Sequence, residues 1–334
     1  MSLPRLLIVA PNWIGDALMA QPLLARLHAK IADLRIDVVA PEWVAPVVRR
    51  MPEVDDVIAA PFRHGALQLR ERWRLGRALR GRGYQQAIVL PNTWKSALVP
   101  FFADVPLRSG YVGESRYGLL NLKYRKSKDQ SMPLHYAALS EPPGKAIQLP
   151  LPEPRLRFTL SQVRATQEKF GIAGPYAVFC PGAEYGPAKR WPYFKELAER
   201  VSLPIVALGS KKDEEAAKDI SSTHNLVGKT ALDEAIDLIA GARYVVTNDS
   251  GLMHVAAALG RPQVALFGSS SPEHTPPLSE AARVLWLKVE CSPCFQRACP
   301  LGHFRCMTEM TVDKVLGEIE NLQGIRGQSP NSRP

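Results

Sequence analysis

The stretch from Tyr244 to Gly260, YVVTNDSGLMHVAAALG, constrains the fold more than any other part of this chain. An apolar run stops at the polar turn 247–251, and apolar residues then recur at helical spacing. This pattern predicts a buried strand, a tight turn and a helix that begins at the turn. The free N–H groups at a helix start attract anions, and Asp249, Ser250 and His254 lie there. The alternative is that Asp249 or Ser250 only caps the helix.

The same alternation of strand and helix patterns runs through both halves of the 334 residues. It predicts an α/β protein with two doubly wound, Rossmann-like domains of mainly parallel strands, which face each other across a cleft. We expect domains at 1–150 and 151–323, a proline-rich linker between them, and a disordered tail at 324–334. The expected strands are 6–10, 36–40, 57–60, 87–90, 107–111, 176–180, 205–208, 244–246 and 264–267. The expected helices are 16–30, 44–50, 66–82, 95–103, 162–170, 193–200, 213–221, 232–240, 252–259 and 312–322.

The positive charge is concentrated in the first half of the chain. Residues 1–150 hold 21 Lys and Arg against 12 Asp and Glu, whereas the remainder holds 21 against 20. Such an excess indicates an anionic partner: nucleic acid, an anionic lipid surface or a phosphorylated substrate. The alternative for the arginines of 70–82 is a solvated helix face. Nucleic acid is disfavoured, because the basic runs hold few aromatic residues and no helix-turn-helix or zinc-finger spacing occurs.

The termini and the cysteines say little about chemistry. No apolar stretch reaches the ~18 residues that span a bilayer, and the N-terminus resembles a first strand more than a signal peptide, so we expect a cytoplasmic protein. Four cysteines, Cys291, Cys294, Cys299 and Cys306, form a C-x2-C-x4-C-x6-C pattern. This spacing matches none of the common two-pair patterns, so free thiols and a structural metal site both stay open.

A second polar segment follows the first expected strand. In PNWIGD, residues 11–16, Gly15 would let the backbone approach a ligand. Asp16 opens the first helix, and its carboxylate would face the interdomain cleft, where it could act as a general base. The alternative is an ordinary first-turn acid that interacts with the helix dipole.

Two further loops belong to the same predicted sheet edge as Asp249. They are residues 181–192, PGAEYGPAKRWP, and residues 268–272, GSSSP. Ligands of open parallel sheets bind beyond the carboxyl ends of the strands, so the three loops should share one rim. Lys189 suits a diphosphate, because its charge is compact and its stem flexible; the alternative is that Lys189 and Arg190 are a solvated pair. The chain has no G-x-G-x-x-G after its first strand and no P-loop, which disfavours dehydrogenases and NTPases.

Together these stretches resemble the heptosyltransferases of lipopolysaccharide inner-core synthesis, glycosyltransferase family 9, which have the GT-B fold. The resemblance covers nearly the whole chain, and it is most specific in TNDSGLMHVAAALGRP and in the AKRWP loop. It implies an inverting transfer of L-glycero-D-manno-heptose from ADP-heptose to the first heptose of the Kdo2–lipid A core. Asp16 and Lys189 match the family's proposed catalytic base and its diphosphate-neutralising lysine.

The resemblance also implies a donor side and an acceptor side. The residues expected to bind the donor are Gly182, Glu184, Tyr185, Lys189, Asp249, Ser250, Gly251, His254, Gly268 and Ser269. The residues expected to bind the acceptor are Asn12, Trp13, Gly15, Arg63, Lys95 and Arg116.

The implied partners are ADP-heptose and heptosyl-Kdo2–lipid A at the inner leaflet of the inner membrane. We expect no tightly bound cofactor or metal, no nucleic acid, a monomer, and peripheral contact of the basic N-terminal domain with the cytoplasmic face of the membrane. Three alternatives stay open: a heptosyltransferase with a different acceptor position, a GT-B nucleotide-sugar epimerase, and a non-catalytic protein that binds anionic lipid.

Overall fold

The computed structural model describes residues 3–63, 65–127 and 130–325. The chain divides into two compact units between Leu156 and Arg157, and each unit is described by itself. The proline-rich stretch before this point is fastened to the first unit, because the Gln21 side chain bonds both the N–H and the carbonyl of Arg155, at 3.0 and 2.8 Å. Of the expected tail, residues 324 and 325 belong to the last helix, and residues 326–334 lie outside the described residues.

The described part of the first unit contains a six-stranded sheet, in which every pair is parallel. Its order, β3-β2-β1-β4-β5-β6, reverses direction between β1 and β4. Apolar runs buried on both sides form its centre, as parallel sheets require. The strands are β1 (Arg5–Val9), β2 (Arg35–Pro41), β3 (Asp56–Ala60), β4 (Gln86–Val89), β5 (Leu107–Tyr111) and β6 (Leu122–Tyr124).

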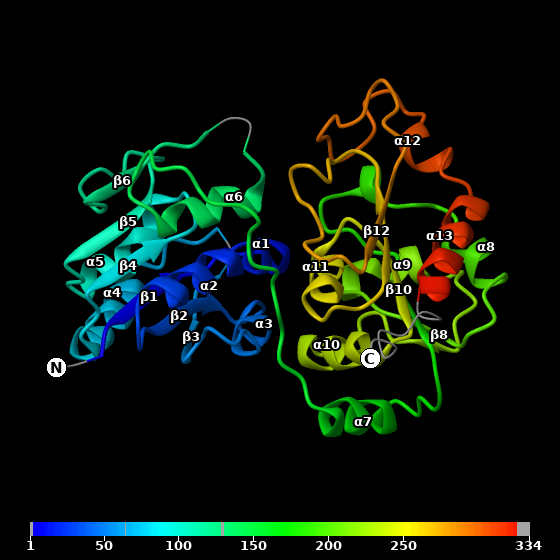
Figure 1. Cartoon of the computed structure of the whole chain (residues 1–334), viewed down its shortest axis with the longest axis horizontal. Coiled ribbons are helices and arrows are strands. Elements are labelled where there is room, and N and C mark those ends of the chain that lie inside the picture. The colour runs from blue at the N-terminus through cyan, green and yellow to red at the C-terminus, as the bar shows by residue number, and fades with distance from the viewer. Residues whose placement is uncertain (1–2, 64, 128–129, 326–334) are drawn as a thin grey trace, which may run out of the picture. The chain divides into compact units, whose positions relative to one another are not determined.

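The helices of the first unit fall into two packed groups, one for each face of the sheet (Figure 1). In the first group, α1 contacts α2, α3 and α6; in the second, α4 packs on α5. This arrangement confirms the doubly wound prediction for the first half. The helices are α1 (Ile14–Met19), α2 (Gln21–Lys30), α3 (Ala45–Arg49), α4 (Leu69–Leu79), α5 (Leu98–Phe102) and α6 (Met132–Ala137), with 3-10 turns η1 (Arg80–Arg82), η2 (Trp94–Ala97) and η3 (Ala138–Ser140).

The single helix expected over residues 16–30 is two helices that break at Ala20. Pro22 lies in the first turn of α2. Proline has no N–H to bond back to the preceding turn, but it fits a helix start, so it ends α1 and begins α2. The break leaves α1 as a short helix that carries Asp16 in its first turn.

The second unit repeats the topology of the first. Its described strands form a parallel six-stranded sheet in the order β12-β11-β10-β7-β8-β9, which reverses between β7 and β10. Counted from β7, this is the strand order of the first unit, so both halves have the doubly wound arrangement. The strands are β7 (Ala177–Cys180), β8 (Ile205–Ala207), β9 (His224–Asn225), β10 (Tyr244–Asn248), β11 (Gln263–Phe267) and β12 (Ala282–Trp286).

Two helix groups also cover this sheet. Helix α10 contacts α7 and α11, whereas α13 contacts α8. The helices are α7 (Leu160–Lys169), α8 (Phe194–Ala198), α9 (Glu214–Ala217), α10 (Leu232–Gly241), α11 (Gly251–Ala258), α12 (Arg305–Thr308) and α13 (Val312–Ile325), with 3-10 turns η4 (Pro187–Lys189) and η5 (Lys211–Asp213).

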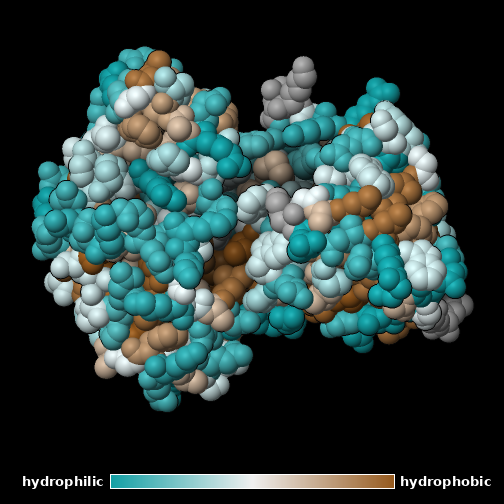
Figure 2. Space-filling model, turned by 180° about the vertical axis from the view of Figure 1, so that it is seen from behind, coloured by the Kyte–Doolittle hydropathy of each residue, from teal (hydrophilic) through white to brown (hydrophobic). Residues whose placement is uncertain are grey.

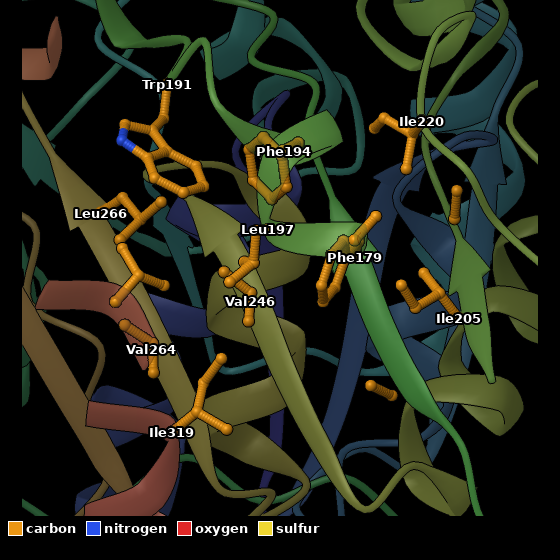
Figure 3. Close-up of a cluster of buried hydrophobic side chains, with 14 of the residues drawn as sticks. Phe179, Trp191, Phe194, Leu197, Ile205, Ile220, Val246, Val264, Leu266 and Ile319 are labelled. Carbon is orange, nitrogen blue, oxygen red and sulfur yellow. The ribbon is translucent and has the colours of Figure 1, made fainter. Parts of the chain in front are cut away.

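One large apolar cluster holds α8 and α13 against the second sheet. Figure 3 shows Phe179 and Val246 on the strands facing Phe194 and Leu197 of α8. Trp191 joins this cluster although it belongs to the loop after β7. Each fully buried apolar side chain of this size contributes about 1.5–3 kcal/mol, so the loop is anchored by the core itself.

The strands and α-helices that the sequence did not predict are β6, α6, β9, β12 and α12. Strands β6, β9 and β12 lie at sheet edges, where no described strand follows them. Most residues of β12 are half-buried, but its sequence ARVLW does contain an apolar run, so this strand is a missed prediction that the sequence itself offered. Strand β6 carries Lys123 at its middle position, and a charged residue there is more typical of a loop than of a strand.

Figure 2 shows that hydrophilic residues cover most of the visible surface of each unit, with smaller hydrophobic patches between them. Among the described residues, no helix is at once long enough and apolar enough to cross a bilayer.

Candidate functional site

The loops after β7, β10 and β11 meet at one edge of the second sheet. Lys189 Nζ lies 2.5 Å from Asp249 Oδ2, and Ser270 Oγ donates a hydrogen bond of 2.5 Å to the same oxygen. The lysine and aspartate side chains are only 15% and 6% exposed. The three loops therefore share one rim, and the alternative that Lys189 is a solvated cation is wrong.

A single amide side chain fixes both ends of the loop that carries Lys189. Asn248, the last residue of β10, donates to the Pro181 carbonyl at 2.7 Å and accepts from the Trp191 N–H at 3.1 Å. The Trp191 indole N–H in turn donates to the Met310 carbonyl at 2.7 Å. Since Asn248 directly precedes Asp249, the loop is held at a fixed place relative to that carboxylate.

Two glycines of this loop are required by close contacts. A Cβ at Gly182 would lie 2.2 Å from the Asp213 Cγ. Gly186 has a φ of +146°, and a Cβ there would lie 2.4 Å from the Arg297 carbonyl oxygen. Any side chain at either position would push the loop away from its neighbours. The predicted role of Gly182 in donor binding stays a prediction; its packing role is visible.

The turn after β10 does not serve as a side-chain cap. Ser250 is the N-cap residue of α11, but its side chain makes no capping hydrogen bond and lies 3.3 Å from the Thr247 hydroxyl. Asp249 directs its Oδ2 to Lys189 and Ser270. The capping alternative for these two residues is therefore wrong.

His254 lies one turn into α11 and is buried. Burial lowers the pKa of its imidazole to about 4, with Asp249 acting in the opposite direction and Lys189 in the same direction. Desolvation dominates because the charged form would lose its hydration. His254 is therefore neutral at pH 7 and presents one donor and one acceptor next to the Lys189–Asp249 pair.

The remaining expected donor residues differ in their surroundings. The Tyr185 ring lies 4.9 Å from Lys189 Nζ, and its hydroxyl donates to the Phe295 carbonyl at 2.6 Å. Glu184 points instead to Lys212, at 2.7 Å.

Ser269 is buried beside the cysteine segment, and its neighbour Ser270 is the serine that contacts Asp249. Sequence reasoning missed Ser270, because the GSSSP run offers three serines and no signal for which one faces the carboxylate.

Gly268 and Gly251 complete the expected donor set. A Cβ at Gly268 would lie 2.4 Å from the Met307 Sδ, so this turn packs tightly under α12. Gly251 is the first residue of α11.

The four clustered cysteines line one small pocket together with Ala188 and Ser269, which belong to the loops after β7 and β11. All are free thiols. Across residues 3–63, 65–127 and 130–325, no three or more His, Cys, Asp or Glu side chains are grouped so that they could hold a metal ion. The segment is joined to the loops after β7 and β11 through the backbone, by Ala188 N–H to the Arg297 carbonyl at 3.1 Å and Phe295 N–H to the Ser269 carbonyl at 2.7 Å.

In the first unit, Asp16 follows β1 at the point where the strand order reverses. The Tyr136 hydroxyl donates to its Oδ1 at 3.2 Å. Burial, and after it the Asp16 charge, raises the pKa of Tyr136 well above its usual value, so this hydroxyl stays a donor. Sequence reasoning missed Tyr136, because the short helix α6 that positions it was not predicted.

The expected acceptor residues of the first unit differ in their contacts and exposure. The Asn12 carbonyl accepts from the Trp43 indole at 2.8 Å, and Trp13 is 48% exposed. Lys95 Nζ donates to the Gly65 carbonyl at 2.6 Å. Gly15 lies in the first turn of α1, one residue before Asp16, and Arg63 is exposed.

Arg116 is buried, and its guanidinium is engaged with the backbone. It donates to the carbonyls of Tyr111 at 2.6 Å, of Pro91 at 2.5 Å and of Thr93 at 3.3 Å. Desolvation lowers the pKa of Arg116 to about 10. The residue ties the loop after β4 to the end of β5.

Comparison with known proteins gives concordant results. The family model described as glycosyltransferase family 9 (heptosyltransferase) matches residues 72–305. The chain is 43% identical to lipopolysaccharide heptosyltransferase 2 of Escherichia coli K12 over 95% of this chain and 98% of that protein. It is 44% identical to lipooligosaccharide heptosyltransferase 2 of Haemophilus influenzae, over 85% and 88%. The solved structure of E. coli ADP-heptose LPS heptosyltransferase II superposes with a TM-score of 0.86 at 40% identity, covering 97% of this chain and 99% of that one. The GT-B expectation is confirmed.

The buried neutral state of His254 predicts a loss of stability in acid. The folded-state pKa of about 4 lies below the ordinary value of 6.5. As pH falls below 6.5, the unfolded chain binds a proton that the native His254 does not, so stability present above pH 6.5 is lost progressively down to about pH 4. At pH 5 the loss is about 2 kcal/mol.

Urea unfolding at pH 7.5 and pH 5 measures this loss. In His254→Gln, which cannot titrate, the difference between the two pH values should shrink by about 2 kcal/mol relative to the parent chain. Equal acid losses in the two chains would show that His254 is not the responsible group.

Proposed function

The chain belongs to glycosyltransferase family 9, the heptosyltransferases, and on this premise we propose which transfer it catalyses. It is a glycosyltransferase of lipopolysaccharide inner-core synthesis. The proposed reaction moves L-glycero-D-manno-heptose from ADP-heptose to the first heptose of heptosyl-Kdo2–lipid A, with inversion at the anomeric carbon. The observation that carries the proposal is the convergence of Lys189, Asp249 and Ser270 at the edge of the second sheet, in a chain so similar to heptosyltransferase II.

On the donor side, we propose that Lys189 exchanges its partner when ADP-heptose binds. In the structure its ammonium group neutralises Asp249. A diphosphate would bring greater negative charge to the same ammonium group, and the N–H groups at the start of α11 would add to its stabilisation. Asp249, still bonded to Ser270, would then accept hydrogen bonds from heptose hydroxyls.

On the acceptor side, the proposed general base is Asp16. It would take the proton from the acceptor 3-hydroxyl as that oxygen attacks the anomeric carbon and ADP leaves. Tyr136, which donates to Oδ1, would hold the carboxylate in orientation. Lys189 would neutralise the charge that develops on the departing diphosphate, and in this mechanism no metal ion is needed for that task.

The acceptor carries phosphate and carboxylate groups, which the basic first half of the chain suits. We propose Arg63 and Lys95 as contacts for these groups, and Asn12, Trp13 and Gly15 as the surface near the base. The carbonyl bonds of Arg116 support a positioning role for this residue, since it shapes the loop from which Lys95 projects.

The proposed reaction is tested by incubating the chain with ADP-heptose and heptosyl-Kdo2–lipid A and following the acceptor by mass spectrometry. We expect a gain of one heptose, and none on Kdo2–lipid A that lacks the first heptose. Addition to the shorter acceptor would indicate a different acceptor position. A change of ADP-heptose without acceptor would indicate an epimerase, and a folded chain with no turnover would support the lipid-binding alternative.

The role of Asp16 predicts a specific kinetic defect. Asp16→Asn should lower kcat by roughly 10²–10⁴, the usual effect of a lost general base, while ADP affinity stays near that of the parent chain. Asp33→Asn is the matched control, because Asp33 is exposed and its φ of 54° is tolerated by asparagine. Turnover of Asp16→Asn within about tenfold of the control would exclude Asp16 as the base.

A further inference from the structure

The outer face of α4 has an unusual composition for a solvated helix. Its exposed residues follow one another at helical spacing, so they form a single face. The face holds only apolar and cationic residues, and the one acid of the helix, Glu71, is half-buried beside it. Leu69 and Trp73 are each 49% exposed. We define the outer face of α4 by its exposed residues, Leu69, Arg70, Trp73, Arg74, Arg77 and Ala78.

The opposite side of α4 is anchored in the first unit. Arg72 is buried and donates to the carbonyls of Leu67 at 2.6 Å and Lys95 at 3.1 Å. Gly76 lets the helix approach α5 so closely that a Cβ would lie 2.5 Å from the Cβ of Phe102. The helix therefore has no freedom to turn its apolar residues inward, and their exposure follows from the packing.

Further exposed apolar residues belong to segments bonded to the start of this helix. Leu67, just before α4, is 41% exposed, and Trp94 is 40% exposed. The Trp94 segment reaches α4 through its neighbour Lys95, which bonds Gly65 and accepts from Arg72. Single exposed apolar side chains are common on proteins, but several grouped among cations indicate a surface that meets a partner.

The charges of the outer face are not neutralised within the fold. Arg70, Arg74 and Arg77 form no ion pair with any residue that the structure describes, whereas Arg80 pairs with Asp104 at 2.7 Å and Arg82 with Asp37 at 3.1 Å. Arg80 and Arg82 therefore stabilise the fold through ion pairs. Arg70, Arg74 and Arg77 of the same run face solvent. The excess positive charge of residues 1–150 has the same sign as this face.

We propose that the outer face of α4 docks on an anionic lipid bilayer. Trp73 and Leu69 would lie at the boundary between headgroups and acyl chains, where tryptophan is favoured, and the three outward arginines would contact lipid phosphates. The inference rests on the proposed function in one respect, since the proposed acceptor is a membrane lipid.

Flotation of the whole chain with vesicles tests this surface without any acceptor. The probes are vesicles of phosphatidylethanolamine with phosphatidylglycerol, and vesicles of phosphatidylcholine alone. We expect binding to the anionic vesicles that weakens with salt, and little binding to the zwitterionic ones. Each outward arginine near an anionic surface is worth about fivefold in partitioning, so R70Q/R74Q/R77Q should lose roughly 100-fold. Trp73→Ala should also lose roughly tenfold.

The matched control lies on α7 in the second unit. Leu160 and Arg164 are exposed there at the spacing of two helix neighbours, and L160A/R164Q should bind vesicles as the parent chain does. All variants change exposed side chains, and equal urea midpoints would verify that each is folded.

Heptose transfer to the acceptor in detergent micelles separates this inference from the proposed function. The α4 variants should keep that turnover, because none of their residues is placed in the reaction. The inference is overturned if the arginine and tryptophan variants bind anionic vesicles as well as the control. It is equally overturned if the parent chain instead binds RNA or dimerises through this face.

Discussion

The ion pair between Lys189 and Asp249 is the interaction on which the arrangement of the loops after β7, β10 and β11 depends. Both side chains are largely removed from water, and loss of one partner from such a pair leaves a charge whose desolvation costs about 3–5 kcal/mol. The pair joins two loops that follow different strands, and Ser270 brings in a third. The strand order and several neighbouring side chains hold these contacts in place.

That support comes from several levels of the fold. The reversal of strand order places β7 beside β10, so that loops distant in sequence leave neighbouring strand ends. Asn248 then fixes the ends of the lysine loop, and Trp191 anchors the loop in the apolar core. His254 stays neutral beside the pair, so the local charge is set by Lys189 and Asp249. A ligand that offers a diphosphate could exchange with Asp249 without rebuilding the site.

The sequence predicted the architecture well because its signals are local. Buried parallel strands are apolar runs, and the turns between them are rich in glycine, proline and small polar residues, so the central strands and the loops after them could be located. The short edge strands β6 and β9 lack that signal, and α6 is too short for a clear period. Pro22 is visible in the sequence, and its missing N–H would have predicted the break that divides the first helix.

From the sequence, the loops that form the site could be predicted, but the contacts between particular side chains could not. That Lys189 and Asp249 would share an edge follows from strand order, which the alternation of elements implies. Which serine of the 268–272 run faces Asp249 depends on backbone direction, and the contact of Tyr136 with Asp16 depends on a helix more than a hundred residues away. The arginines of α4 differ for the same reason: only packing distinguishes buried Arg72 from its exposed neighbours.

The central claim is that Lys189 and Ser270 act on one carboxylate to form one donor site. A double-mutant cycle with Lys189→Met and Ser270→Ala, read as the affinity for the proposed donor ADP-heptose by calorimetry, tests it most directly. Because both side chains contact Asp249 Oδ2, the account predicts a coupling energy of about 1 kcal/mol or more between them. Effects that add to within about 0.3 kcal/mol would contradict it, since independent sites behave in that way.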